Sequence, residues 1–182
     1  MEQKELRSLL EAVAQGTLSP DEAVLRFRQA PFEDLGFAKL DHHRALRQGV
    51  AEVIYGAGKT REQILAIASA FLERGQQTVL ITRMDPEAAE WVGEHLPLTY
   101  DPVSRVGIAG HLPEPDGDGF ILVATGGTSD IPVAEEAAQT AQALGNEVKR
   151  LYDVGVAGLH RLLSQMCIRD RASFSRWANW GM

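Results

Sequence analysis

Residues 120–130 read FILVATGGTSD, and this stretch decides the fold. Its first five residues are all apolar, which is typical of a parallel strand buried on both faces. Residues 131–144 follow with a helical pattern that Gly145 ends, and residues 147–152 have the composition of another strand. The order strand, turn, helix, strand predicts a right-handed crossover within a parallel sheet.

The turn between this strand and its helix is a candidate phosphate site. Its amides and hydroxyls would converge on the positive N-terminal end of the helix, and glycine lets the backbone approach a ligand closely. The alternative is that a serine or aspartate only caps the helix. Because two glycines and three polar residues exceed what a cap needs, we predict that a ligand is bound by Gly126, Gly127, Thr128, Ser129 and Asp130.

A second polar segment begins at Asp153, where the next strand ends. Ligands of parallel sheets bind at the carboxyl ends of the strands, so this segment should face the same crevice. We predict that Asp153 holds a ribose hydroxyl or transfers a proton, and that His160 or Arg161 meets a carboxylate or phosphate. The alternative is that Gly155 and Gly158 shape a turn while His160 lies on a solvated helix face.

The residues before this unit are predicted to form a smaller mixed α/β region. Residues 19–22 read SPDE, a capping box with proline at the first helical position, and Thr60 with Gln63 forms another. Apolar spacing and caps predict helices over residues 3–15, 19–29, 60–75 and 85–95, and strands over 37–40, 52–55, 78–82 and 103–108. A Pro, Asp and Gly cluster at 112–119 predicts a linker and a domain boundary.

The N-terminal region also offers basic residues as anion contacts. Lys39 and Arg44 lie in a basic polar stretch that is equally well explained as a solvated loop. Residues 56–60 read GAGKT, but Val53 stands where a full phosphate-binding loop needs glycine. Lys59 at a helix start is still predicted to meet an anion.

Composition excludes several partners. The formal net charge is −7 and the basic residues are scattered, so we predict no nucleic-acid partner. No apolar run reaches the length of a membrane span and the N-terminus lacks a signal core, so we predict no membrane partner and a cytoplasmic location. Cys167 is the single cysteine and is predicted to be an incidental thiol.

From Gly126 to Arg161 the sequence resembles the phosphoribosyl-aminoimidazole carboxylase and mutase family, whose hallmark is a Gly-Ser-x-Ser-Asp turn. Three residues of the turn match, whereas Gly127 replaces the first serine and residues 153–156 replace a Ser-Ala-His-Arg segment. These departures are similar to the LarB family of nickel-pincer cofactor biosynthesis proteins, which carry a carboxylase-like domain behind a distinct N-terminal region. That resemblance runs from about Asp34 to Leu163 and is most specific at residues 38–44, 52–56 with Lys59, 126–134 and 153–161.

The resemblance to LarB implies an enzyme that carboxylates C5 of the pyridinium ring of nicotinic acid adenine dinucleotide and hydrolyses its phosphoanhydride, releasing AMP. It implies carbon dioxide or bicarbonate as co-substrate, no tightly bound cofactor, and a homo-oligomer for full-length relatives, and it leaves a divalent metal open. A thiolate added at C4 would make C5 nucleophilic. In the family that cysteine lies further downstream, and Cys167 does not match it.

We therefore expect an α/β protein built on a parallel sheet of βαβ units. The expected parts are a LarB-type N-terminal region over 1–111, a truncated flavodoxin-like carboxylase-type domain over 118–165, and an unrelated tail over 166–182. A chain of this kind is expected to lack carboxylase activity, because it lacks the nucleophile. Asp153 and His160 are the predicted catalytic residues, and Lys39, Arg44, Lys59 and Arg161 are predicted to contact substrate beside the turn. The alternatives are a purine-pathway aminoimidazole ribotide carboxylase and a non-catalytic nucleotide-phosphate-binding module.

Overall fold

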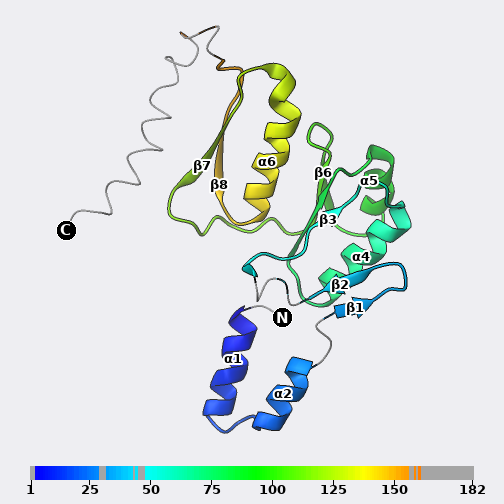
Figure 1. The fold of residues 1–182 in the computed structure, drawn as a ribbon, viewed down its shortest axis with the longest axis vertical. Coiled ribbons are helices and arrows are strands. Elements are labelled where there is room, and N and C mark those ends of the chain that lie inside the picture. The colour runs from blue at the N-terminus through cyan, green and yellow to red at the C-terminus, as the bar shows by residue number, and fades with distance from the viewer. Residues whose placement is uncertain are drawn as a thin grey trace, which may run out of the picture.

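The chain begins with a pair of helices in the computed structural model, which describes residues 3–28, 32–42, 44, 48–155, 158 and 160 (Figure 1). These are α1 (Gln3–Ala14) and α2 (Pro20–Arg28). The predicted capping box starts α2: the Ser19 hydroxyl accepts a hydrogen bond from the Glu22 amide, and the Glu22 carboxylate accepts one from the Ser19 amide, each 3.1 Å long. A short antiparallel hairpin of β1 (Phe32–Asp34) and β2 (Lys39–Asp41) follows.

A four-stranded sheet organises the middle of the chain. Its strands are β3 (Ile54–Tyr55), β4 (Thr78–Thr82), β5 (Leu98–Asp101) and β6 (Val106–Gly110), in the order β3-β4-β6-β5. The β3 and β4 strands are parallel, whereas β4 with β6 and β6 with β5 are antiparallel. The sheet is therefore mixed, with β3 and β4 as its parallel pair, and the expected α/β class is confirmed.

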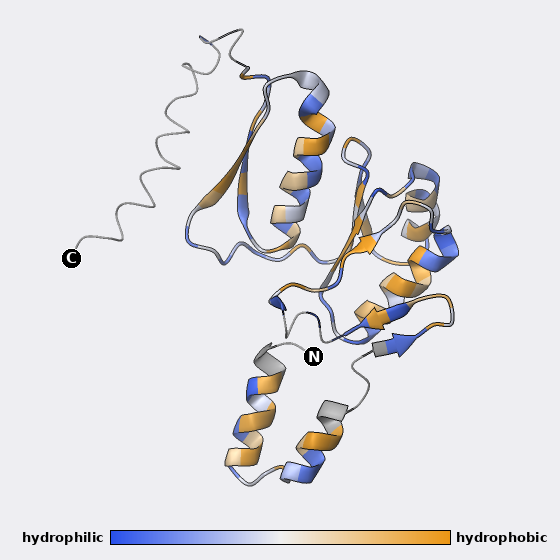
Figure 2. Ribbon diagram, in the orientation of Figure 1, coloured by the Kyte–Doolittle hydropathy of each residue, from blue (hydrophilic) through white to orange (hydrophobic). Residues whose placement is uncertain are grey.

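Two helices cover one face of this sheet, α4 (Arg61–Glu73) and α5 (Pro86–Gly93). The predicted capping box at Thr60 and Gln63 starts α4. The helix then buries Ile64, Ile67 and Phe71 against the sheet, as its apolar stripe predicts. The main core lies between these helices and the sheet, and Figure 2 shows hydrophobic residues along β6 and on the inner side of α4.

The decisive stretch forms the second unit. It consists of β7 (Phe120–Ala124), a 3₁₀ turn at Thr128–Asp130, α6 (Ile131–Ala143) and β8 (Glu147–Leu151). The β7 and β8 strands pair in parallel from Phe120 opposite Glu147 to Ala124 opposite Leu151, which confirms the predicted crossover unit. The prediction that β7 is buried on both faces is wrong: Ile121 is 40% exposed, because β7 has only β8 as a neighbour among the described strands.

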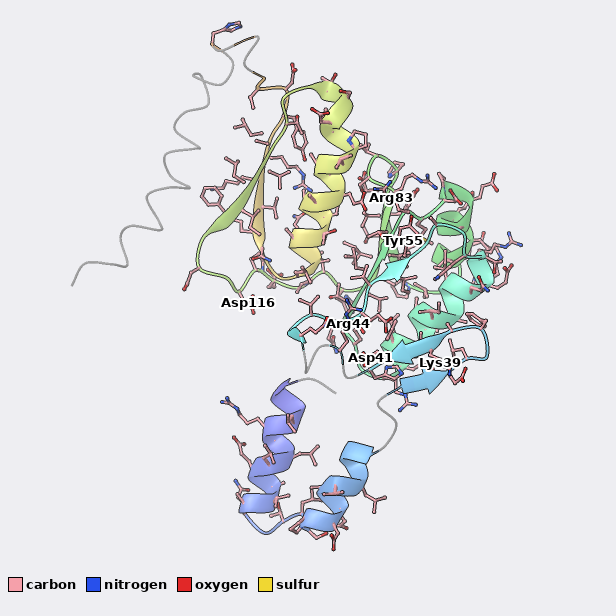
Figure 3. All side chains as sticks on the ribbon, viewed as in Figure 1. Lys39, Asp41, Arg44, Tyr55, Arg83 and Asp116 are labelled. Atoms are coloured by element: carbon pink, nitrogen blue, oxygen red, sulfur yellow. The ribbon has the colours of Figure 1, made fainter. Side chains whose placement is uncertain are left out.

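Helix α6 packs against both sheets. It contacts β7 and β8 of its own unit and also β4 and β6 of the four-stranded sheet. At its end Ala143 joins a cluster with Leu80, Val106 and Ile108. In its middle Glu136 pairs at 3.1 Å with Arg83, which is labelled in Figure 3. The loop of 112–119, which we predicted to be a linker, thus connects two sheets that share a helix. None of the described helices is long and apolar enough to cross a membrane.

Candidate functional site

The turn after β7 and the segment after β8 lie side by side. The Thr125 amide donates to Leu151 O at 3.0 Å, and the Thr125 carbonyl accepts from the Val154 amide at 3.0 Å. The buried Thr125 hydroxyl accepts from the Asp153 amide at 3.1 Å. These bonds continue the pairing of the two strands beyond their ends, so the structure brings the predicted phosphate turn and Asp153 to one edge of the sheet.

Gly155 and Gly126 make the closest approach between the two segments. The Gly155 amide donates to Gly126 O at 2.9 Å. A Cβ atom at position 155 would overlap Gly126 O and lie 3.2 Å from the Gly126 carbonyl carbon. Glycine is therefore required at 155 for the segments to meet.

Within the turn, the side chains do not cap α6. Asp130 occupies the N-cap with helical backbone angles, and neither it nor Ser129 makes a side-chain bond to the first helical amides. Instead the Asp130 carboxylate accepts from the Gly127 amide at 3.2 Å. In the described part of the chain the Ser129 hydroxyl has no hydrogen-bond partner, and Thr128, Ser129 and Asp130 are all exposed. The turn thus offers free hydroxyls to a ligand. The Asp130 carboxylate would compete with the ligand for the Gly127 amide.

Asp153 has the left-handed backbone angle φ of 56°. Residues other than glycine rarely adopt this conformation, and such residues cluster at functional sites. The remaining predicted residues of this segment are less informative: His160 is exposed, and Arg161 lies outside the described residues. The catalytic roles of Asp153 and His160 stay predictions.

A polar network that the sequence did not reveal supports the segment. The Tyr152 hydroxyl donates to Glu135 Oε1 at 2.8 Å, and Arg150 Nε donates to the same carboxylate at 2.9 Å. Burial, with the hydrogen bond to Glu135 and its negative charge, raises the pKa of Tyr152 from 10.0 to about 12. No sequence signal joins these residues, because Glu135 lies on α6 and Tyr152 follows β8.

This pKa shift predicts a loss of stability at alkaline pH. The raised pKa means that the folded state favours the neutral phenol, so its contribution is complete below about pH 10 and is lost as the pH rises through about 12. We expect the difference in unfolding free energy between the native chain and Tyr152→Phe to shrink over this range. Urea unfolding across the range measures it, and a difference that stays constant would show that Tyr152 has an ordinary pKa.

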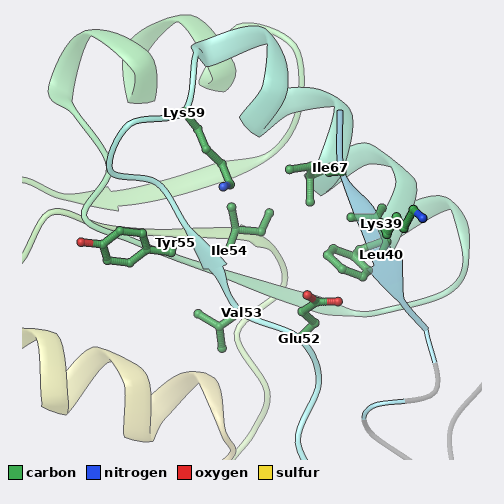
Figure 4. A pocket seen from close by; sticks show the side chains of 10 residues that line it. Lys39, Leu40, Glu52, Val53, Ile54, Tyr55, Lys59 and Ile67 are labelled. Carbon is green, nitrogen blue, oxygen red and sulfur yellow. The ribbon is translucent and has the colours of Figure 1, made fainter. Parts of the chain in front are cut away.

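A cavity of about 260 Å³ lies between β2, β3 and α4 (Figure 4). Two of the predicted anion contacts, Lys39 and Lys59, line it. The Lys39 side chain is 72% exposed and lies 4.0 Å from Asp34, whereas Lys59 points into the cavity. Arg44 is exposed and is not among the described lining residues.

Metal binding was left open by the sequence. Among the residues that the structure describes, no group of three His, Cys, Asp or Glu side chains is placed to hold a metal ion. Cys167 lies outside them.

Comparison with known proteins finds a family match in the N-terminal part of the chain. Residues 32–111 match the LarB/PurE-like N-terminal domain. An uncharacterized protein of Methanocaldococcus jannaschii is 34% identical over 166 residues, which cover 87% of this chain. The chain spans 65% of the length of that relative. The similarity to this family therefore covers residues 32–111, a stretch that ends before β7.

Proposed function

We propose that the chain is part of an enzyme that carboxylates the pyridinium ring of nicotinic acid adenine dinucleotide and hydrolyses its phosphoanhydride to release AMP. The match over residues 32–111 supports a carboxylase or mutase of the LarB/PurE type. The nicotinate substrate rests on the resemblance of residues 126–134 and 153–161 to the LarB family. The observation that carries the proposal is the junction of the glycine-rich turn with Asp153 at the carboxyl ends of β7 and β8.

The predicted site residues have distinct roles in this proposal. The exposed hydroxyls of Thr128 and Ser129 donate to a phosphate of the substrate, and Gly126 leaves room for it. Asp153 holds a ribose hydroxyl and His160 exchanges a proton. Lys39, Arg44, Lys59 and Arg161 supply positive charge to the remaining anionic groups.

The carboxylation itself requires a nucleophile and a co-substrate. Addition of a thiolate at C4 gives a dihydropyridine whose C5 attacks carbon dioxide, and loss of the C5 proton and of the thiol restores the aromatic ring. No described residue supplies the thiolate, since the single cysteine lies outside the described residues. We further propose a cytoplasmic homo-oligomer that acts on this small molecule, with no nucleic-acid or membrane partner, on the basis of its acidic composition and the same resemblance.

Calorimetry with three ligands tests the substrate. The purified chain is titrated with nicotinic acid adenine dinucleotide, aminoimidazole ribotide and AMP. We expect the dinucleotide to bind most tightly. Preference for aminoimidazole ribotide would support the purine-pathway alternative, which the matching Gly126, Ser129 and Asp130 favour. Equal affinity for the dinucleotide and AMP would support a binding module without this chemistry. The longer relative from M. jannaschii, given labelled bicarbonate and the dinucleotide, tests the carboxylation step.

Replacing Ser129 with alanine tests the turn. The hydroxyl is exposed and unpaired within the described residues, so the free energy of unfolding should change by less than about 0.5 kcal/mol. Binding of AMP should weaken by about 1–3 kcal/mol, because hydrogen bonds to charged groups are on this scale.

A control variant lies on α6, the helix that follows the turn. Val133 is 66% exposed on α6, and Val133→Ala should alter neither stability nor AMP affinity by more than about 0.5 kcal/mol. An unchanged AMP affinity in Ser129→Ala would remove the turn from the phosphate site.

A further inference from the structure

The cavity beside β3 has a rigid apolar floor. Leu40, Ile54, Ile67 and Phe71 line it, and each is at most 4% exposed. They belong to the main core cluster and come from β2, β3 and α4. A floor made of core side chains keeps its shape when solvent or a ligand fills the cavity.

The loop that carries Lys59 is fixed by backbone hydrogen bonds and by its glycines. The Gly56 amide donates to Thr82 O at 2.7 Å, and a Cβ at position 56 would lie 2.9 Å from that oxygen. Gly58 takes the left-handed angle φ of 78°, and the Lys59 amide donates to Gly56 O at 3.0 Å. Thr60 then starts α4 with its capping box, so the backbone on both sides of Lys59 is fixed.

The Lys59 ammonium is unpaired inside this cavity. Figure 4 shows its side chain pointing over Ile54 toward the middle of the space. Across the residues that the structure describes, no carboxylate lies within 4.0 Å of it, although the other lysines with described side chains, Lys39 and Lys149, each pair with an acid. A half-buried cation over apolar surface lacks solvent on one side, so an anionic ligand would stabilise it.

Glu52 sets the charge that the ligand can carry. It lines the cavity near Leu40, and its Oε2 accepts the Asp41 amide at 2.8 Å, which fixes the carboxylate in place. Lys39 of the same lining already pairs with Asp34, so the charges left for a ligand are one ammonium and one carboxylate. They favour a ligand with a single negative charge over a phosphate dianion, which Glu52 would repel more strongly. The volume of about 260 Å³ is below the range of about 300–1,000 Å³ for drug-sized ligands, so a ligand of one ring fits inside it.

From these features we infer that the cavity is a binding site for a small ring-shaped monocarboxylate. Its ring lies on the floor formed by Ile54, Ile67 and Phe71, and its carboxylate pairs with Lys59. The inference deepens the proposed function, on which it rests for the role of Lys59, and it names the ligand class that Lys59 holds. The site shares no residue with the turn after β7. It can bind its ligand whether or not the turn binds a phosphate.

Three probes of matched shape test the site in the full chain by calorimetry. Benzoate should bind with one-to-one stoichiometry. Benzamide, which has the same ring without the charge, should bind at least about tenfold more weakly, and so should phenyl phosphate, because Glu52 opposes its second charge. Equal or tighter binding of benzamide or phenyl phosphate, or no saturable binding of benzoate, would overturn the inference.

Variants of the lysine test its role. Lys59→Gln should weaken benzoate at least about tenfold, whereas Lys59→Arg should restore most of the affinity because it keeps the charge. Lys149→Gln removes a lysine of β8 that does not line the cavity and serves as the matched control. Circular dichroism establishes that each variant is folded. Benzoate binding that survives in Lys59→Gln, or that falls equally in Lys149→Gln, would contradict the assignment.

Discussion

Replacing Phe71 with alanine is expected to lower the free energy of unfolding by about 3–5 kcal/mol. Phe71 is 2% exposed and is the largest fully buried side chain among the residues that the structure describes. Its ring meets the His42 ring edge-on, with centroids 5.5 Å apart, and it packs in the core cluster between α4 and the four-stranded sheet. Truncation removes this burial and leaves a void that α4 cannot fill, because its neighbours are held by the sheet.

Urea unfolding followed by circular dichroism measures this loss. Whole domains have stabilities of about 5–15 kcal/mol, so the variant should unfold at a much lower urea concentration. Leu25→Ala is the control: Leu25 is 63% exposed on α2, and its loss should cost less than about 0.5 kcal/mol. A cost below about 1 kcal/mol for Phe71→Ala would mean that the described core does not stabilise the fold.

The second unit could be predicted from sequence almost to the residue. The predicted strand of 120–124 is β7, the predicted helix of 131–144 is α6 to within one residue, and the strand of 147–152 is β8 to within one residue. Local sequence sets where these elements begin and end. An apolar run ends at the turn glycines, and Gly145 with φ of 79° ends the helix.

The four-stranded sheet was harder to predict, because its strands depend on distant partners. The sequence analysis missed β5 and placed β6 over residues 103–108, whereas β6 spans Val106–Gly110. Two glycines within β6 hide its strand character. A Cβ at Gly107 would lie 2.9 Å from Met84 Sδ and force that side chain to shift, a contact that exists only in the folded chain. The antiparallel pairing of β6 with β4 likewise has no local signal.

The candidate sites, like the fold, have some features that the sequence predicts and others that depend on distant contacts. Strand order alone predicted that the turn and Asp153 would meet at one edge, and the hydrogen bonds of Thr125 place them there. The Tyr152 and Glu135 pair and the bond from the Gly127 amide to Asp130 could not be predicted, because they depend on side-chain positions. The cavity of Lys59 is assembled from three separate segments, so the sequence indicated its lysines as anion contacts without indicating the space between them.

The turn after β7 and the segment after β8 can meet only because Gly155 has no side chain. Its amide bond to Gly126 O, 2.9 Å long, brings the backbone of 153–155 against the turn. Any Cβ at 155 would overlap Gly126 O and press on the Gly126 carbonyl carbon. Backbone atoms are the obstacle, so no side-chain rotation relieves the overlap. The turn and the Asp153 segment would have to separate.

Gly155→Ala is therefore expected to weaken AMP binding by at least about tenfold, while lowering the free energy of unfolding by about 1–3 kcal/mol, the usual cost of overpacking. Calorimetry and urea unfolding measure the two effects on the same preparation. Gly117→Ala is the matched control, because Gly117 lies in the loop before β7 and its added Cβ would meet only Asn146 Oδ1 at an ordinary 3.6 Å. That variant should retain AMP affinity within about twofold. If Gly155→Ala bound AMP as tightly as Gly117→Ala, the phosphate would not depend on the junction of the turn with the Asp153 segment.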